Sequence, residues 1–156
     1  MSVHGTLLSN EPAAAEQAAA GHDGATSSLL TFVRPVIGFP DCSRYELRNL
    51  DAEYAPYRML VSLDQPGLEF IVVSPGVLFD DYVIEIADAD ASALGLEVAA
   101  EVEVIVIVTA GRSPVPTVNL LGPVVINRRT AVAAQLVLNE ERYGVATPVD
   151  AASAFG

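Results

Sequence analysis

From Thr31 onward the sequence consists of short apolar runs rich in β-branched residues, separated by Pro, Gly, Asp and Asn at fairly regular intervals. This spacing is typical of an antiparallel sandwich or barrel, and Val, Ile and Leu at this density favour strands over helices. The chain is therefore predicted to be all-β and mainly antiparallel, as a barrel-like or sandwich domain. Strands are expected at 31–37, 45–50, 57–63, 68–74, 82–86, 97–109, 117–121, 124–127 and 131–138.

One segment departs from the strand pattern and favours a helix. Alanines alternate through 88–94, Asp88 is placed to cap the N-terminus, and Gly95 is placed to end the helix. One short helix is therefore predicted. Pro75 and Gly76, which follow an expected strand, predict a simple turn.

Residues 1–30 are rich in Ala, Gly and Ser and have few large apolar side chains, so they predict a disordered N-terminal tail. They contain three carboxylates and no arginine, so they lack the positively charged segment with which a secretory signal peptide begins. The folded domain is expected over 31–149, with a short disordered tail at 150–156. Of the net charge of −12, residues 31–156 carry −9.

The composition excludes several classes of function. All eight basic residues are Arg, and both histidines lie in the tail. Without His or Lys, the domain cannot build a Ser-His-Asp triad, a Schiff base or most zinc sites. We therefore predict no catalytic residue, no metal site and no cofactor. The charge is too negative for direct nucleic-acid binding, and the longest apolar run, at 104–110, is far below the ~20 residues of a membrane span.

Two polar features remain as candidate sites. Carboxylates cluster between 80 and 90, which suggests either a metal or acid–base site or a solvated turn followed by a helix cap. Asn119 and Asn127 follow apolar residues although Asn is depleted within strands. Each Asn is explained equally well by turn capping or by contact with a partner.

Three blocks of the sequence resemble the FliW family of bacterial flagellar assembly factors. The first is VIGFP at 36–40. The second, at 60–86, contains a Ser-Leu-x-x-Pro turn, an apolar strand ending in Pro, and an aspartate followed by Tyr. The third, PTVNLLGPVVINRRTAVAAQLVL at 116–138, is the most specific. The resemblance spans about residues 31–149. One departure is DCSRY at 41–45, where the family usually has a glycine-rich turn.

The resemblance implies a cytoplasmic, non-enzymatic protein that is monomeric when free and binds other proteins. Its expected partners are CsrA, a small basic repressor of flagellin translation, and flagellin itself. The protein is expected to act as an antagonist of CsrA, and flagellin is expected to compete with CsrA for it. A domain of charge −9 without Lys suits a basic partner. The expected partner-binding residues are Asp80, Asp81, Tyr82, Asn119, Asn127 and Arg128.

This assignment makes a first expectation: Asp81→Arg or Asn127→Ala weakens CsrA binding while the melting temperature holds. Two alternatives stay open. A metal-binding enzyme or small-ligand barrel requires three of Asp80, Asp81, Asp88 and Asp90 to converge. A purely structural subunit requires self-association without CsrA binding.

Overall fold

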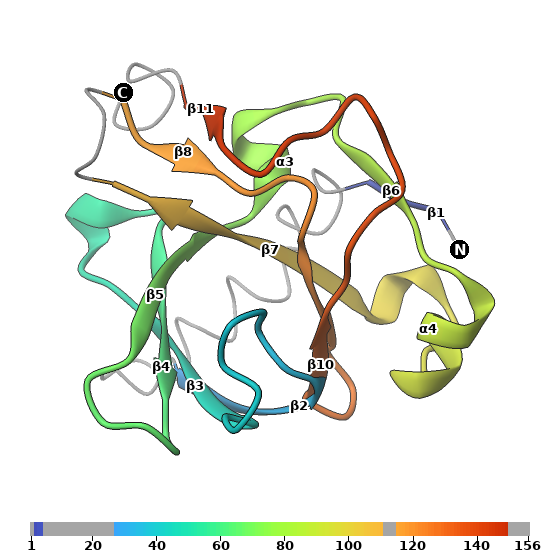
Figure 1. The fold of residues 1–156 in the computed structure, drawn as a ribbon, viewed down its shortest axis with the longest axis horizontal. Coiled ribbons are helices and arrows are strands. Elements are labelled where there is room, and N and C mark those ends of the chain that lie inside the picture. The colour runs from blue at the N-terminus through green and yellow to red at the C-terminus, as the bar shows by residue number, and fades with distance from the viewer. Residues whose placement is uncertain (1, 5–26, 111–114, 150–156) are drawn as a thin grey trace.

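The computed structural model describes residues 2–4, 27–110 and 115–149, and its centre is a closed barrel of seven strands (Figure 1). In order around the ring, each strand pairs with the next and the last pairs with the first. Every neighbouring pair is antiparallel except β2 and β10, which run parallel. The order is β7 (Val102–Thr109), β5 (Glu69–Val73), β4 (Arg58–Ser62), β3 (Arg44–Asn49), β2 (Ser27–Arg34), β10 (Val132–Gln135) and β9 (Val124–Asn127). The predicted all-β, mainly antiparallel fold is confirmed.

Four shorter strands lie outside the ring. β8 (Thr117–Val118) pairs with the end of β7, and β11 (Thr147–Pro148) pairs with β8. β1 (Ser2–His4) and β6 (Val83–Glu85) form a separate two-stranded sheet. The β8–β9 region therefore lies along one edge of β7, interrupted by residues 119–123.

The prediction of a single helix is wrong, because the described residues contain two short α-helices. α4 (Asp88–Ala93) is the expected helix, and α3 (Pro75–Leu78) replaces the expected turn. Pro75 lies at the start of α3, where its fixed φ suits a helix and its missing N–H costs no hydrogen bond. Asp88 does not cap α4, because the N-cap residue is Ala87. Two 3₁₀ turns, η1 (Ala52–Tyr54) and η2 (Ala99–Glu101), are the other helical elements among the described residues.

Two strand boundaries also differ from expectation. β2 begins at Ser27, inside the predicted tail of 1–30, because residues 27–30 pair with β3 and Leu30 is buried in the barrel. Residues 2–4, in the same predicted tail, form β1. The remaining tail positions, 5–26 and 150–156, lie outside the described residues. β7 begins at Val102 rather than residue 97, because 99–101 form η2.

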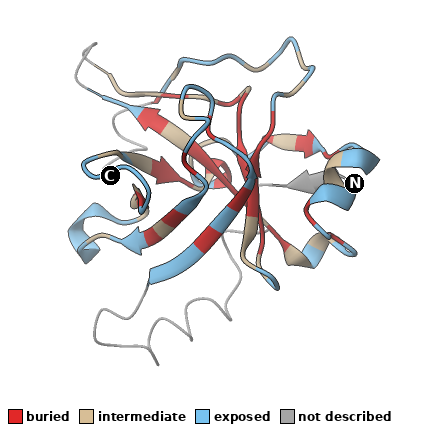
Figure 2. Ribbon diagram, turned by 60° about the horizontal axis from the view of Figure 1, so that its bottom comes forward, coloured by how far each residue is buried: buried red, intermediate tan, exposed pale blue. Residues whose placement is uncertain are grey.

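The described residues bury two apolar cores, one on each side of the β7–β9 pair. Figure 2 shows the buried residues gathered along the strands. The first fills the barrel, where the strand registers place apolar residues opposite one another around the ring. These facing pairs include Leu30–Tyr45, Leu47–Leu60, Val72–Ile107 and Ile105–Val124. The second core lies outside this part of the wall and includes residues of β6, α4 and the loop after β10. Consequently β7 is buried on both faces.

The DCSRY segment docks onto the turn between β4 and β5. Asp64 in that turn accepts hydrogen bonds from the backbone N–H groups of Ser43 and Arg44 at 2.8 and 2.9 Å, and the Arg44 guanidinium donates to it as well. Cys42 turns into the barrel core. The backbone N–H of Arg44, then that of Ser43 and then the Arg44 side chain lower the pKa of Asp64 from 3.8 to about 2.

These hydrogen bonds predict a pH dependence of stability. A carboxyl group whose pKa is lowered by folding stabilises the protein above pH 3.8, and this contribution is lost as the pH falls towards 2. In thermal unfolding, Asp64→Asn should lower the melting temperature at pH 7, and its difference from wild type should shrink between pH 4 and pH 2. Asp51→Asn is the control, because the Asp51 side chain makes no cap hydrogen bond. A difference for Asp64→Asn that does not change with pH would contradict this role.

Candidate partner-binding site

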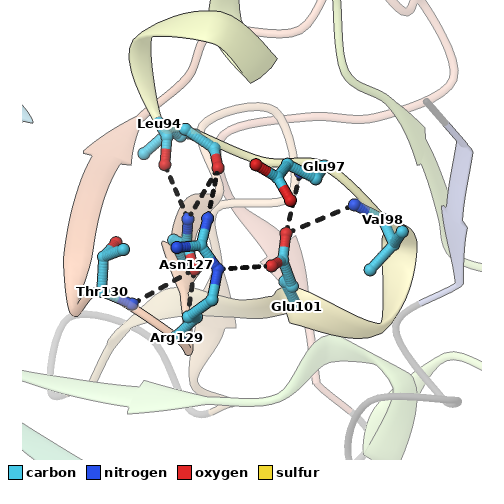
Figure 3. A network of polar contacts seen from close by, with 8 residues as sticks. Leu94, Glu97, Val98, Glu101, Asn127, Arg129 and Thr130 are labelled. Carbon is cyan, nitrogen blue, oxygen red and sulfur yellow. Dashed lines mark hydrogen bonds and ion pairs between the residues drawn. The ribbon is translucent and has the colours of Figure 1, made fainter.

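Asn127, at the end of β9, is fully buried and hydrogen-bonded at both ends of its side chain (Figure 3). Its Nδ2 donates to the carbonyl oxygens of Leu94 and Gly95, at 2.8 and 3.2 Å. Its Oδ1 accepts from the backbone N–H groups of Arg129 and Thr130, at 2.9 and 3.3 Å. One side chain thus links the turn after β9 to the end of α4.

The carbonyls that Asn127 binds belong to a Schellman motif. Gly95 has a φ of +67°, its N–H donates to the Ser92 carbonyl, and the Leu96 N–H donates to the Ala91 carbonyl. This pattern needs a left-handed residue, for which glycine has no steric cost. The expectation that Gly95 ends the helix is confirmed.

Arg129 and Glu101 form the charged half of the same network. Arg129 Nε donates to Glu101 Oε2 at 2.6 Å, and its Nη2 donates to the Gly95 carbonyl at 2.9 Å. Glu101 Oε1 accepts the N–H groups of Glu97 and Val98. The Glu97 N–H and then the Arg129 guanidinium lower the pKa of Glu101, and Glu101 in turn raises the pKa of Arg129. A cation at the end of α4 also matches the helix dipole.

Arg128 lies between Asn127 and Arg129 in the sequence, and its backbone N–H donates to the Glu101 carbonyl at 2.7 Å. Its side chain is half-buried. The other arginines within 27–110 and 115–149 each pair with a carboxylate, and Arg128 has no such ion pair there. The network therefore holds the backbone of an arginine whose charge is not neutralised by a described carboxylate.

Asn119 orders the interruption between β8 and β9. Its Oδ1 accepts the Gly122 N–H at 2.9 Å, and Gln135 Nε2 donates to the Gly122 carbonyl at 2.8 Å. A Cβ on Gly122 would lie 2.9 Å from Asn119 Nδ2 and 3.1 Å from Gln135 Nε2, so a larger residue would displace these two amide groups. Gln135 also accepts the Ile37 N–H at 2.7 Å. The two amide side chains thus fix the loop that contains Gly122 and Pro123.

Tyr82 is buried beside this interruption rather than exposed. Its hydroxyl donates to the Leu120 carbonyl at 2.7 Å, and its ring lies 4.7 Å from that of Tyr143. Burial and then the neighbouring Tyr143 raise the pKa of Tyr82 above its usual value of 10. Tyr82 therefore stays neutral and ties the start of β6 to residue 120.

Asp80 and Asp81 are exposed in the turn between α3 and β6. The neighbouring Asp90 forms an ion pair with Arg34 of β2, so it is not directed at the other acidic residues. Among the described residues, no three of the His, Cys, Asp and Glu side chains are grouped closely enough to hold a metal ion. The convergence required by the metal-binding alternative is thus not found in this part of the chain.

The six expected partner-binding residues do not form one patch. Tyr82 and Asn119 belong to one group, with Asp80 and Asp81 next to Tyr82 in sequence, while Asn127 and Arg128 lie at the opposite end of β9. Sequence reasoning missed Glu101, Arg129 and Gln135, which complete the two polar networks. The one available signal was Gln135, a polar residue within the apolar end of the most specific family-like block; the sequence holds no signal that pairs Glu101 with Arg129.

The family model described as FliW protein matches residues 15–149. This chain belongs to the FliW family. The flagellar assembly factor FliW of Natranaerobius thermophilus is 35% identical over 124 residues, covering 78% of this chain and 81% of the relative. That of Bacillus subtilis is 30% identical over 122 residues, covering 78% and 85%.

A solved structure gives the same result for the fold. The crystal structure of a flagellar assembly factor FliW superimposes with a TM-score of 0.69 at 27% identity, covering 77% of this chain and 84% of the other. The chain is therefore a flagellar assembly factor, and the resemblance seen in the sequence is confirmed. No helix among the described residues is long and apolar enough to span a membrane.

The burial of Asn127 changes the result expected for Asn127→Ala. The substitution leaves two carbonyls and two N–H groups without their partner, so it should lower the free energy of unfolding by about 3 kcal/mol. For Asn127→Ala this geometry therefore predicts a lower melting temperature, in place of the unchanged one expected from the sequence. Arg128→Ala is the matched control and should change that free energy by less than about 0.5 kcal/mol. Urea unfolding of both variants checks this, and equal stabilities would contradict it.

Proposed function

We propose that this FliW-family protein is a cytoplasmic, non-catalytic antagonist of CsrA that also binds flagellin and so links the flagellin level to flagellin translation. The proposal rests on the family relationship together with the charge of the chain, which has 20 acidic residues and 8 basic ones. A strongly acidic surface favours encounter with a basic protein such as CsrA. The free protein is proposed to be a monomer.

The observation that carries the proposal furthest is the exposed pair Asp80–Asp81. Neither residue forms an ion pair with any described arginine, so both charges are available to a partner. Both follow the apolar strand in the second family-like block. We assign direct contact to Asp80, Asp81 and Arg128, which have side chains at least partly on the surface. Tyr82 and Asn127 act by holding the backbone of these segments, and Asn119 orders the loop to which the Tyr82 hydroxyl is bonded.

Charge reversal tests the acidic contact. Asp80→Arg combined with Asp81→Arg should weaken CsrA binding roughly ten-fold in calorimetry, because two favourable charge contacts become repulsive. The wild-type affinity should also fall as salt is raised. Asp51→Arg combined with Glu53→Arg is the control, with the same change of charge in an exposed loop between β3 and β4, far from β6 in Figure 1. Equal affinities for all three proteins, with unchanged melting temperatures, would contradict the assignment.

The two-partner switch is tested by competition. Flagellin added in excess should reduce the amount of CsrA that the wild-type protein retains in a pull-down, because one antagonist cannot serve both partners. Bovine serum albumin at the same concentration is the control. Retention of CsrA at an unchanged level, with flagellin also bound, would contradict the switch while leaving CsrA binding intact.

A further inference from the structure

β6 lies outside the barrel, and its two edges are satisfied in different ways. On one edge, the Tyr143 hydroxyl accepts the Val83 N–H at 3.0 Å and donates to the Val83 carbonyl at 2.9 Å. Tyr143 is itself held against the buried ring of Tyr82. A side chain from the second core therefore closes this edge.

The other edge of β6 is covered by β1. The two strands are antiparallel, with Ser2 opposite Glu85, Val3 opposite Ile84 and His4 opposite Val83. Backbone groups of successive strand residues point to alternate edges. Since the groups of Val83 face Tyr143, those of Ile84 face β1, and Val3 and Ile84 form the hydrogen-bonded pair. Figure 1 shows the two strands side by side, beyond the barrel wall.

Several features of the β1–β6 pairing favour its exchange for another strand. β1 has three residues, and a two-stranded ribbon is marginally stable without further strands. β1 and β6 are separated by 78 residues of sequence, numbers 5–82, so they are not joined as a hairpin whose turn would fix the register. By contrast, Ile84 is buried and Tyr82 is bonded to residue 120, which keeps β6 in place when β1 leaves. The edge of β6 is therefore preformed, and the short strand β1 that covers it can be replaced by another strand.

The surroundings of this edge select the kind of strand. Asp80 and Asp81 precede β6, Asp88 follows it, and all three are exposed. In the antiparallel arrangement of β1, a segment on this edge would pass Asp88 before its paired residues and Asp80–Asp81 after them. Basic residues on both sides of a short apolar core would fit these charges.

We infer that β6 is a docking edge at which an extended, basic segment of a protein partner replaces β1. Backbone hydrogen bonds to Ile84 supply affinity, and the flanking carboxylates select the segment, as in other cases of strand addition. β1 is then an internal competitor that keeps the edge covered until the partner arrives. The inference rests on the proposed function, because the partner is the basic protein that the function requires.

A reversible lock tests the exchange. His4→Cys with Val83→Cys places two thiols at a non-hydrogen-bonded pair, where the Cα atoms of antiparallel strands lie about 4.5 Å apart, within disulfide range. The native Cys42 is buried in the barrel and does not compete. Oxidised protein should bind CsrA at least about ten-fold more weakly than the same protein after reduction. The single variant Val83→Cys, with and without reductant, is the control.

A release variant and a direct readout complete the test. Val3→Pro removes the N–H that faces Ile84, so the Ile84 amide should exchange faster with solvent, and CsrA should bind about two-fold tighter or more. Adding CsrA should protect the Ile84 amide again. Equal binding by the oxidised and reduced lock, or no protection of Ile84, overturns the docking edge while CsrA antagonism stands. No CsrA binding by wild type overturns the proposed function and the inference together.

Discussion

The pairing of β7 with β9 is the interaction on which the rest of the structure depends. It closes the ring of seven strands, and it also forms the wall that separates the two cores. Ile105 and Val124 face the barrel, whereas Val104 and Val125 face the outer core. Because these strands are buried on both faces, each needs an almost continuous apolar sequence, and such sequences leave no room for polar side chains except at the strand ends.

This constraint explains the two asparagines. Asn119 precedes β9 and Asn127 ends it, so each lies where the chain leaves a wall that is covered on both sides. A backbone that turns inside a buried region needs hydrogen-bond partners that water cannot provide. Asn offers a donor and an acceptor on a short side chain. Asn127 uses both on neighbouring turns, and Asn119 uses its acceptor on the Gly122 N–H. The turn that Asn127 holds carries the exposed Arg129 and Thr130, whereas the turn after Asn119 is buried or half-buried.

The local sequence pattern therefore predicted the strands and the barrel-like class. It could not predict features that depend on contacts between residues far apart in the sequence. Alternation at 82–86 gave the buried face of β6 correctly, with Tyr82, Ile84 and Ile86 all buried. Nothing local indicates that Glu101 meets Arg129 across 28 positions, or that residues 2–4 pair with β6. The helix α3 was missed because Pro-Gly is a turn signal unless the following residues pack. The candidate site was found only in part, since a surface charge such as Asp81 and a buried amide such as Asn127 are both polar in the sequence.

Closure of the barrel also decides where a partner strand could be added. A closed ring leaves few free edges, so within the described residues most of them belong to the strands outside it, in the β1–β6 and β8–β11 pairs. β11 ends in Pro148, which has no N–H to offer an incoming strand. β6 has the opposite character: its backbone is anchored by Tyr82 and Tyr143, and its outer edge is covered by three residues from the far end of the chain. Because the ring of seven strands is closed, strand exchange is directed to the edge of β6 that residues 2–4 already cover.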